Sequence, residues 1–378
     1  MSQSNMKFTD EQLINCLQQG LSNRAIGRKF NVDEAGVRRR KTKLLNQGIL
    51  TDNTSYALPA GHQLRGVTYK ANDKGELEPY WVKSKNIDSE EKDIERLKEK
   101  VEAVINSVPA RPTIDRYSLE VDDNLLACYP LGDRHIGMMA WKAECGKDWD
   151  LKIAKRVLCE TFEKVVKRAP PCKRALIVDL GDYLHSDNLE GFTMRSKNIL
   201  DMDSRYPKMI DVGIEIFLFM IDKCLEHHEE VDVEILPGNH NEIGGVWMVR
   251  VLVAHYRDNP RVNIKLNEAP IHCYQWGKVM LAMHHGHTIK MQQMPGTCAA
   301  DYPKIWGNTI YRYGLMGHIH KDSQFGDETS GMKVNSFRTL AAADSYAKWH
   351  GYRSGCDTKV IVYHKEDGQV EEYTINIK

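Results

Sequence analysis

The feature that most constrains the fold is a pattern repeated five times along the chain. An apolar run ends, and aspartate, asparagine or histidine follows beside a glycine, in residues 132–135, 181–185, 238–242, 284–287 and 317–320. Short apolar runs bounded by turn residues are typical of buried strands. In α/β sheets, ligands bind beyond the carboxyl ends of such strands. We therefore expect the five polar segments to converge on one crevice.

Around these segments, apolar runs alternate with helical periodicity from about residue 113 to the end. Strands are expected over 125–129, 175–180, 231–236, 262–266, 279–283 and 313–316, with a hairpin of 360–364 and 370–376. Helices are expected over 149–168, 210–227 and 246–256. This alternation predicts an α/β domain over residues 113–378.

A smaller, basic unit is expected before this domain. Residues 8–48 predict three short helices, with Thr9 and Ser22 capping the first two. Residues 1–50 contain nine basic and four acidic residues. Two short helices joined by a tight turn, the second one basic, resemble a helix-turn-helix, which predicts DNA contact. The predicted contacts are Arg38, Arg39, Arg40, Lys41 and Lys43. The alternatives are a protein-binding module or a bundle whose basic face is only solvated.

Residues 51–112 are interpreted as a connector between 1–50 and 113–378. They contain a predicted hairpin of 63–70 with 78–83 and a predicted amphipathic helix over 88–107. The sequence of this segment does not indicate a function.

Composition excludes several classes of protein. The chain has 378 residues, of which 42% are hydrophobic and 28% charged, and no apolar run reaches the roughly 18 residues of a membrane helix. The first residues are polar and lack the apolar core of a signal peptide, so we expect a cytoplasmic protein without membrane contact. Nine scattered cysteines argue against a disulfide framework or a zinc knuckle.

The chemistry of the five segments is that of a metal site. They offer carboxylate oxygen, amide oxygen and imidazole nitrogen, which divalent metals bind. A carboxylate has two oxygens and can bridge two ions, whereas an imidazole normally binds one. Mixed oxygen and nitrogen ligation suits Mn, Fe or Zn better than Mg or Ca.

The series Asp-x-His, Gly-Asp, Gly-Asn-His, His-Gly-His and Gly-His-x-His resembles the calcineurin-like metallophosphoesterase family over residues 125–320. That resemblance implies a two-sheet sandwich flanked by helices, with two metals at the strand ends. The basic N-terminal module followed by a hairpin also resembles members encoded by tailed phages, for which the location would be the host cytoplasm. A more distant resemblance is to DNA-repair exonuclease subunits.

Carried onto this sequence, the resemblance implies two ligand sets. One metal would be held by Asp133, His135, Asp182 and His320, and the other by Asp182, Asn239, His285 and His318. Manganese is the expected activating ion, with iron and zinc as alternatives. The nucleophile would be a hydroxide that bridges the metals.

Two residues are expected to be catalytic. Asp182 would bridge and orient the metals, and His240 would stabilise the phosphoryl oxygens or protonate the leaving oxygen. The family usually has an acidic residue directly after this histidine. Here Asn241 takes that place and Glu242 follows, so either is a candidate for supporting His240.

Other polar residues near the strand ends are candidates for substrate contact. His284, His285 and His287 compete for one ligand role; the His-Gly-His motif favours His285 and places His287 near the substrate. Arg134 is either a phosphate contact or a salt-bridged or solvent-facing side chain. The expected substrate contacts are Arg134, His185, His287 and Arg195, and for Arg195 the alternative is a charged loop whose side chains pair with one another.

Two further groups have simpler interpretations. His227 and His228 are expected to be structural. The aromatic–basic cluster of Lys348, Trp349, His350, Tyr352 and Arg353 is interpreted as packing of aromatic side chains, with stacking on exposed bases as the alternative.

Taken together, these features favour a metal-dependent hydrolase, specifically a phosphodiesterase or nuclease that acts on DNA. A phosphomonoesterase for proteins or small molecules is the alternative, because the same ligand set supports that reaction. A non-enzymatic DNA-binding protein with a relict site is disfavoured, because no ligand position is missing. The oligomeric state is not readable from the sequence.

Overall fold

The computed structural model describes residues 8–19, 21–46, 62–71, 77–86, 108–117, 119–193, 197–326 and 329–377. The chain divides into two compact units, Met1–Val104 and Ile105–Lys378. The helix expected over 88–107 lies outside the described residues, and so does Arg195.

Three helices open the first unit, and polar residues set their ends. α1 (Asp10–Gln18) begins at Thr9, whose hydroxyl accepts a hydrogen bond from the backbone N–H of Gln12. α2 (Asn23–Phe30) begins at Ser22 and ends at Asn31, a left-handed residue with φ 52°. α3 (Glu34–Asn46) follows. The side chains buried between the helices are Phe8, Leu13, Cys16, Leu17, Ile26, Val37 and Leu44.

A two-stranded antiparallel sheet belongs to the same unit. β1 (His62–Ala71) pairs with β2 (Leu77–Asn86), with Val67 opposite Val82. The pairing agrees with the hairpin predicted from residues 63–70 and 78–83.

The larger unit contains a six-stranded sheet in the order β13-β12-β3-β4-β5-β6. Four neighbouring strands, β3 to β6, run parallel, and β12 and β13 complete the sheet with antiparallel pairings. The strands are β3 (Asp122–Leu131), β4 (Cys172–Asp179), β5 (Glu230–Ile235), β6 (Val262–Ile264), β12 (Cys356–His364) and β13 (Gly368–Ile377).

A second sheet has five strands in the order β10-β11-β9-β8-β7. Its central strands β8, β9 and β11 are parallel, and each edge strand is antiparallel to its neighbour. The strands are β7 (His272–Trp276), β8 (Val279–His284), β9 (Tyr311–Met316), β10 (Ser323–Phe325) and β11 (Lys333–Ser336). The sequence patterns did not predict β7, β10 or β11, which are only three to five residues long.

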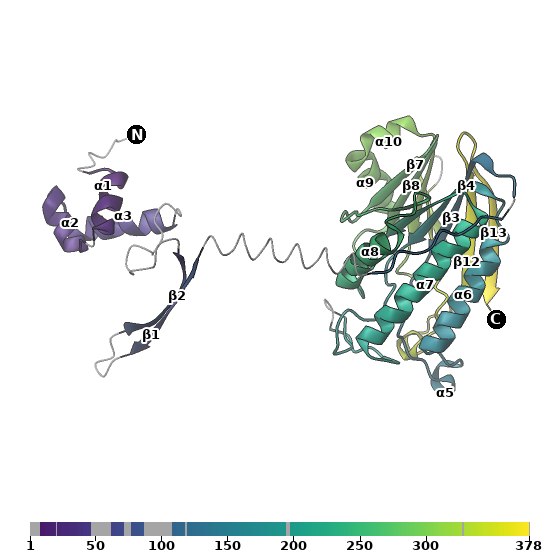
Figure 1. Ribbon diagram of the computed structural model, residues 1–378, viewed down its shortest axis with the longest axis horizontal. Helices are drawn as coiled ribbons and strands as arrows, with labels where there is room; N and C mark the ends of the chain where they lie inside the picture. Colours follow the sequence, from purple (N-terminus) through teal and green to yellow (C-terminus); the bar gives the residue numbers. More distant parts are fainter. Residues whose placement is uncertain are drawn as a thin grey trace. The chain divides into compact units, whose positions relative to one another are not determined.

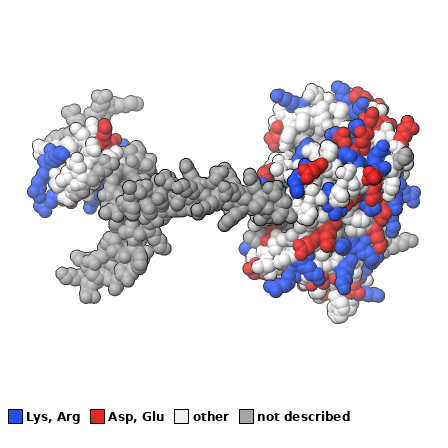
Figure 2. All heavy atoms as spheres, in the orientation of Figure 1, with Lys and Arg blue, Asp and Glu red and all other residues white. Residues whose placement is uncertain are grey.

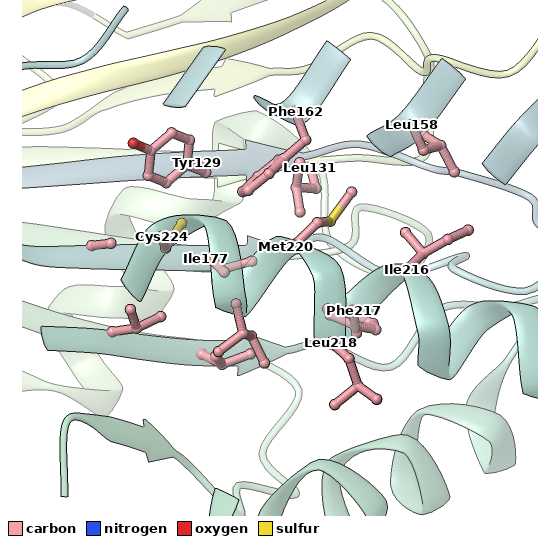
Figure 3. Packing of buried hydrophobic residues seen from close by; sticks show 14 of the residues in the cluster. Tyr129, Leu131, Leu158, Phe162, Ile177, Ile216, Phe217, Leu218, Met220 and Cys224 are labelled. Carbon is pink, nitrogen blue, oxygen red and sulfur yellow. The ribbon is translucent and has the colours of Figure 1, made fainter. Parts of the chain in front are cut away.

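The two sheets pack face to face, and helices cover both outer faces. Leu126, Val178, Leu281 and Leu315 lie in the core between the sheets. Figure 1 shows α6 (Leu151–Val166), α7 (Tyr206–His227) and α8 (Glu242–Tyr256) over the six-stranded sheet, and Figure 3 shows side chains of α7 over β3 and β4. This is the predicted α/β arrangement of two sheets flanked by helices.

Shorter helices complete the unit. α9 (Met294–Asp301) and α10 (Pro303–Asn308) cover the outer face of the five-stranded sheet. The others are α5 (Lys142–Cys145), η2 (Met291–Gln293) and α11 (Ser345–Trp349). All nine cysteines are free thiols. Within the described ranges, no helix combines the length and apolar character needed to span a membrane.

His228, directly after α7, is a structural histidine, as predicted. Its Nδ1 accepts a hydrogen bond from the backbone N–H of Cys172 at 3.1 Å, and its Nε2 lies 2.6 Å from the hydroxyl of Tyr129. Burial, and then the charge of His227, hold the pKa of His228 well below its ordinary value. The neutral ring therefore fits this pocket, whereas a second proton on Nδ1 would meet the Cys172 N–H.

We expect this histidine to make the fold less stable in mild acid. Because the folded pKa is lowered, the unfolded chain binds the extra proton first, so the contribution is complete above about pH 6.5 and is lost as the pH falls. Each pH unit below that point costs up to about 1.4 kcal/mol from this residue. Urea unfolding of the metal-free wild type and His228→Asn at about pH 7.5 and pH 5.5 measures the difference. An equal loss of stability in both proteins would contradict the assignment.

Candidate metal centre

The five polar segments converge because each follows a strand of one of the two parallel arrays. Residues 132–135, 181–185 and 238–242 follow β3, β4 and β5, which are neighbours in the six-stranded sheet. Residues 285–287 and 317–320 follow β8 and β9, which are parallel neighbours in the other sheet. The carboxyl ends of parallel strands meet at one edge of a sheet, so both sheets deliver their ligand-type side chains to the same end of the sandwich.

Three groups of ligand-type side chains form there, and one of them, His135 with His185 and His240, contains a single predicted ligand. The other two are the first and second groups. In the first, Asp133, His135 and His320 bring their donor atoms within 4.8 Å of one another. In the second, Asp182, His285 and His318 do the same. Asn239 joins the second group, because its Oδ1 lies 3.1 Å from His285 Nε2. The structure thus brings together every residue predicted as a metal ligand.

The contacts within these groups fit a cation. His135 Nε2 and His320 Nε2 face each other at 3.3 Å, and His320 Nε2 is 3.4 Å from Asp133 Oδ1. Two facing imidazole nitrogens can share only one proton, whereas a cation between them accepts both lone pairs. Asp133 is fully buried, and a buried carboxylate needs such a counter-charge.

Asp182 and His285 form the electrostatic centre of the site. Asp182 Oδ2 lies 3.1 Å from His285 Nε2. Burial would raise the pKa of Asp182, but His285, His240 and His135 outweigh burial and hold it below its ordinary value. Burial would lower the pKa of His285, yet Asp182 and Asp133 raise it to about 9. The surroundings of His285 therefore favour positive charge and retain a proton on its ring. Metal binding to His285 would release that proton.

The backbone is strained at the ligand positions. Outside glycine, the described residues with positive φ are six, and four of them are predicted ligands: His135 at 45°, Asp182 at 51°, His318 at 66° and His320 at 50°. Such conformations are uncommon for residues with a side chain and gather at functional sites. No local sequence motif marks these histidines or this aspartate as left-handed, so the strain could not be predicted.

Glycine at two of the motifs allows the close packing of the site. A Cβ on Gly238 would lie 2.2 Å from both the backbone nitrogen and Oδ1 of Asp182. Gly181 has φ 94°, and a Cβ there would lie 2.7 Å from His285 Nδ1. These glycines are therefore required by space around Asp182 and His285.

His240 is oriented by a group that the sequence did not suggest. Its Nδ1 donates to the backbone carbonyl of His185 at 2.8 Å, and its backbone N–H donates to Asp182 Oδ1 at 2.8 Å. Asn241 therefore does not support the ring, whereas support by Glu242 stays a prediction. Asn241 is fully buried, and among the described residues its side-chain amide has no hydrogen-bond partner.

His185 lies behind the first group and not on an open surface. Only 2% of it is exposed, and its Nδ1 is 3.3 Å from His135 Nδ1. Burial, with His240 nearby, lowers the pKa of His185 to about 3, so its ring is neutral at pH 7. His185 thus lies with His135 and His240, and one ligand-type nitrogen from each ring lies within 4.8 Å of the others. A substrate contact by His185 stays a prediction.

Arg134 also departs from its predicted role as a substrate contact. It is 1% exposed, and its guanidinium donates to Asp179 Oδ1 at 2.9 Å. The guanidinium carbon lies 4.6 Å from the ring centroid of Tyr183 and 4.8 Å from that of Phe217. Its side chain therefore points into the packed interior, which fits the salt-bridged alternative.

The three histidines after β8 have separate places. His285 contacts Asp182 and Asn239, as the motif predicted. His284 is buried and turned into its own loop, where Nδ1 accepts from the Gly286 N–H at 2.8 Å. His287 is half-buried, with its ring centroid 5.2 Å from that of His285. A substrate contact by His287 stays a prediction.

Two further residues hold the site through contacts that the sequence did not indicate. Asp187 accepts hydrogen bonds from the backbone N–H groups of Ile243 and Gly244, at 2.6 and 2.8 Å, and so fixes the start of α8 after His240. The Thr339 hydroxyl donates to the backbone carbonyl of Asp133. Both contacts join segments far apart in the sequence, so no local pattern indicates them.

In the first unit, the predicted DNA contacts divide into two sets. Arg38, Arg39 and Lys43 are exposed, and Lys41 is half-exposed. Arg40 is instead used internally: it pairs with Asp10, donates to the carbonyl of Phe8 at 2.9 Å and is only 16% exposed in its side chain. The prediction that Arg40 contacts DNA is therefore corrected to a role in joining α3 to α1.

Comparison with known proteins yields only distant similarities. No family model and no curated protein matches the chain. Similar solved structures include the phosphoesterase YfcE from E. coli, with 14% identity, a TM-score of 0.31 and coverage of 67% of this chain and 100% of that one. Another is a predicted phosphoesterase from Streptococcus pneumoniae TIGR4, with 9% identity, a TM-score of 0.27 and coverage of 68% and 100%. Vps29 from Entamoeba histolytica, complexed with Zn²⁺, has 9% identity, a TM-score of 0.27 and coverage of 67% and 98%. Similarity at this level assigns neither an activity nor a ligand to this chain.

Proposed function

We propose that this chain is a two-metal-dependent phosphodiesterase that cleaves DNA. The supporting observation is the pair of ligand groups, Asp133–His135–His320 and Asp182–His285–His318, at one end of the sandwich. Asp182 interacts electrostatically with His285 of the second group and His135 of the first, as a bridging carboxylate would. The family resemblance of the motifs leads to the same reaction class.

The donor set favours manganese, iron or zinc, because each group mixes carboxylate oxygen with imidazole nitrogen. Asp133, His135 and His320 would hold one ion and Asn239, His285 and His318 the other, with Asp182 shared. Two bound ions would lower the pKa of a water nucleophile and neutralise charge on the phosphate.

The chain's own residues would position the substrate and transfer a proton to the leaving oxygen. The carbonyl of His185 keeps a proton on His240 Nδ1, so Nε2 is the nitrogen that can exchange a proton with the leaving oxygen. Asp182 Oδ1 accepts the backbone N–H of His240 and so ties this ring to the ligand set. A neutral Asn239 limits the negative charge that would repel a phosphate.

DNA is the proposed substrate because of the basic first unit. Figure 2 shows Lys and Arg atoms gathered over part of the three-helix region, whereas the visible face of the larger unit mixes both signs. Arg24, Arg28 and Lys29 of α2 are exposed, as are Arg38, Arg39 and Lys43 of α3. Such exposed cations neutralise phosphates and make affinity depend on salt.

The test is hydrolysis by the full chain with Mn²⁺, Fe²⁺ or Zn²⁺ added to metal-free protein. The substrates are bis-(p-nitrophenyl) phosphate, p-nitrophenyl phosphate, and end-labelled single- and double-stranded DNA. We expect diester and DNA cleavage. Monoester turnover with intact DNA would change the assignment to a phosphomonoesterase, and no turnover with any metal would refute a phosphoesterase.

A charge variant tests the role of the first unit. Arg38→Ala/Arg39→Ala/Lys43→Ala should weaken DNA binding and lower the slope of log affinity against log salt by about two to three. A control that removes three exposed cations from the α6 region, Lys152→Ala/Lys164→Ala/Arg168→Ala, should leave the slope unchanged. Equal effects in both variants would show that binding depends only on net charge.

A further inference from the structure

An exposed group of aromatic rings lies in the segment that follows β11. Helix α11 begins at Asp344, whose carboxylate accepts the Ala347 N–H at 2.8 Å. The ring centroids of Tyr346 and His350 are 4.0 Å apart, and the rings of His350 and Tyr352 are stacked at 6.3 Å. We call Tyr346, His350 and Tyr352 the aromatic platform.

The platform is not part of a core, contrary to the packing interpretation preferred from the sequence. Tyr346 is 55% exposed and Tyr352 48% exposed, and His350 is exposed as well. Single exposed aromatics are common, but a contiguous group of them indicates a binding surface. None of these three rings belongs to a buried hydrophobic cluster.

The platform is connected to the candidate metal centre at two points. Lys321 directly follows His320, and its ammonium lies 5.8 Å from the ring centroid of Tyr352. The backbone carbonyl of Lys321 is held by the Ser336 hydroxyl at 2.6 Å. Thr339, in the segment that leads into the platform, donates to the carbonyl of Asp133. Tyr352 therefore lies near the segment that carries His318 and His320.

The surroundings of the platform are positively charged on one side and negatively charged on the other. Lys321 and Arg353 are exposed beside Tyr352, and Arg353 donates to the Tyr352 carbonyl at 2.8 Å. On α11, Ser345 and Trp349 instead contact Glu144, which lines a hollow of about 450 Å³ together with Asp148, Asp150, Asp201 and Asp203. A polyanion is attracted to the Lys321 side and repelled by the acidic hollow.

We infer that the aromatic platform stacks on unpaired nucleobases of a strand whose phosphate reaches the metal centre. Every nucleobase has a π-face that stacks on an aromatic side chain, and cations beside the rings accept the backbone. In a duplex these faces are covered by neighbouring bases, so the platform selects single-stranded or frayed ends. This inference rests on the proposed function and specifies its substrate.

Binding of two strands to the full chain tests the platform. The probes are a fluorescent oligothymidylate and an abasic strand of the same length and charge, in Ca²⁺ to prevent cleavage. The wild type should prefer the strand with bases by at least about tenfold, because each stacked base contributes substantially to affinity. Tyr346→Ala/Tyr352→Ala should lose this preference and retain its affinity for the abasic strand.

The matched control is Tyr373→Ala, which removes a partly exposed tyrosine from β13 and should keep the preference. Bound metal in each variant, measured by elemental analysis, verifies that the site is intact. A preference for bases that survives in the double variant would overturn the inference, as would a wild type that binds both strands equally. The proposed function is tested separately by hydrolysis of bis-(p-nitrophenyl) phosphate, which does not need a base.

Discussion

Asp182→Asn should abolish metal retention and lower phosphodiester hydrolysis by at least about a thousandfold, because a bound metal supplies several kcal/mol of transition-state stabilisation. Asp182 is the carboxylate that interacts with both ligand groups, and an amide cannot replace its charge. His240→Ala should differ, because His240 is in neither predicted ligand set. We expect this variant to keep two metals and to lose about 10²- to 10⁴-fold in rate, as for a lost general acid.

Elemental analysis after gel filtration, together with kcat for bis-(p-nitrophenyl) phosphate, separates the two variants. Asp232→Asn is a matched control, because Asp232 of β5 is also buried but accepts hydrogen bonds from Tyr274 on β7 and Arg174 on β4. It should retain wild-type metal. Stoichiometric metal in Asp182→Asn would show that the bridging assignment is wrong, and loss of metal in His240→Ala would make His240 a ligand.

Arg134→Met should destabilise the fold by about 3–5 kcal/mol, because removing one partner of a buried ion pair leaves the other uncompensated. Asp179 is fully buried, and burial already raises its pKa while Arg134 opposes that shift. Methionine retains much of the contact with Tyr183 and Phe217 but not the charge. Urea unfolding of metal-free protein near neutral pH measures the change.

The double variant Arg134→Met/Asp179→Leu distinguishes lost charge pairing from lost packing. Replacing both partners by apolar side chains removes the buried charge, so much of the stability should return. A double variant as unstable as the single one would assign the loss to packing. A loss below about 1 kcal/mol in Arg134→Met would mean that the pair contributes no more than a surface ion pair.

Much of the metal centre was predictable because its pattern is local. Each ligand-type residue stands one to four positions beyond an apolar run, and parallel strands of a sheet align their ends. The structure accordingly brings together all the residues from Asp133 to His320 that were predicted as ligands. Whether they bind metal is a separate question, which the Asp182 variant addresses.

The parts that could not be predicted depend on contacts between distant segments. In the sequence, Arg134 is a polar residue in a loop. Its partners, Asp179 on β4 and Phe217 on α7, are distant in sequence and become apparent only in the fold. His240 is oriented by a backbone carbonyl, which every residue has and no sequence motif reports. The short strands β7, β10 and β11 have too few residues for periodicity to distinguish them from loops.

The division of ligands between the sheets has a mechanical consequence. The first group takes Asp133 and His135 from the end of β3 and His320 from the end of β9, and the second takes Asp182 from β4 and His285 from β8. An ion at either position would link the two sheets, which also contact each other through the apolar core and through hydrogen bonds such as those from Tyr274 to Asp232 and from Trp276 to the Asn124 carbonyl. Chelation would remove this link, so the concentration of free metal would affect the stability of the sandwich as well as its chemistry.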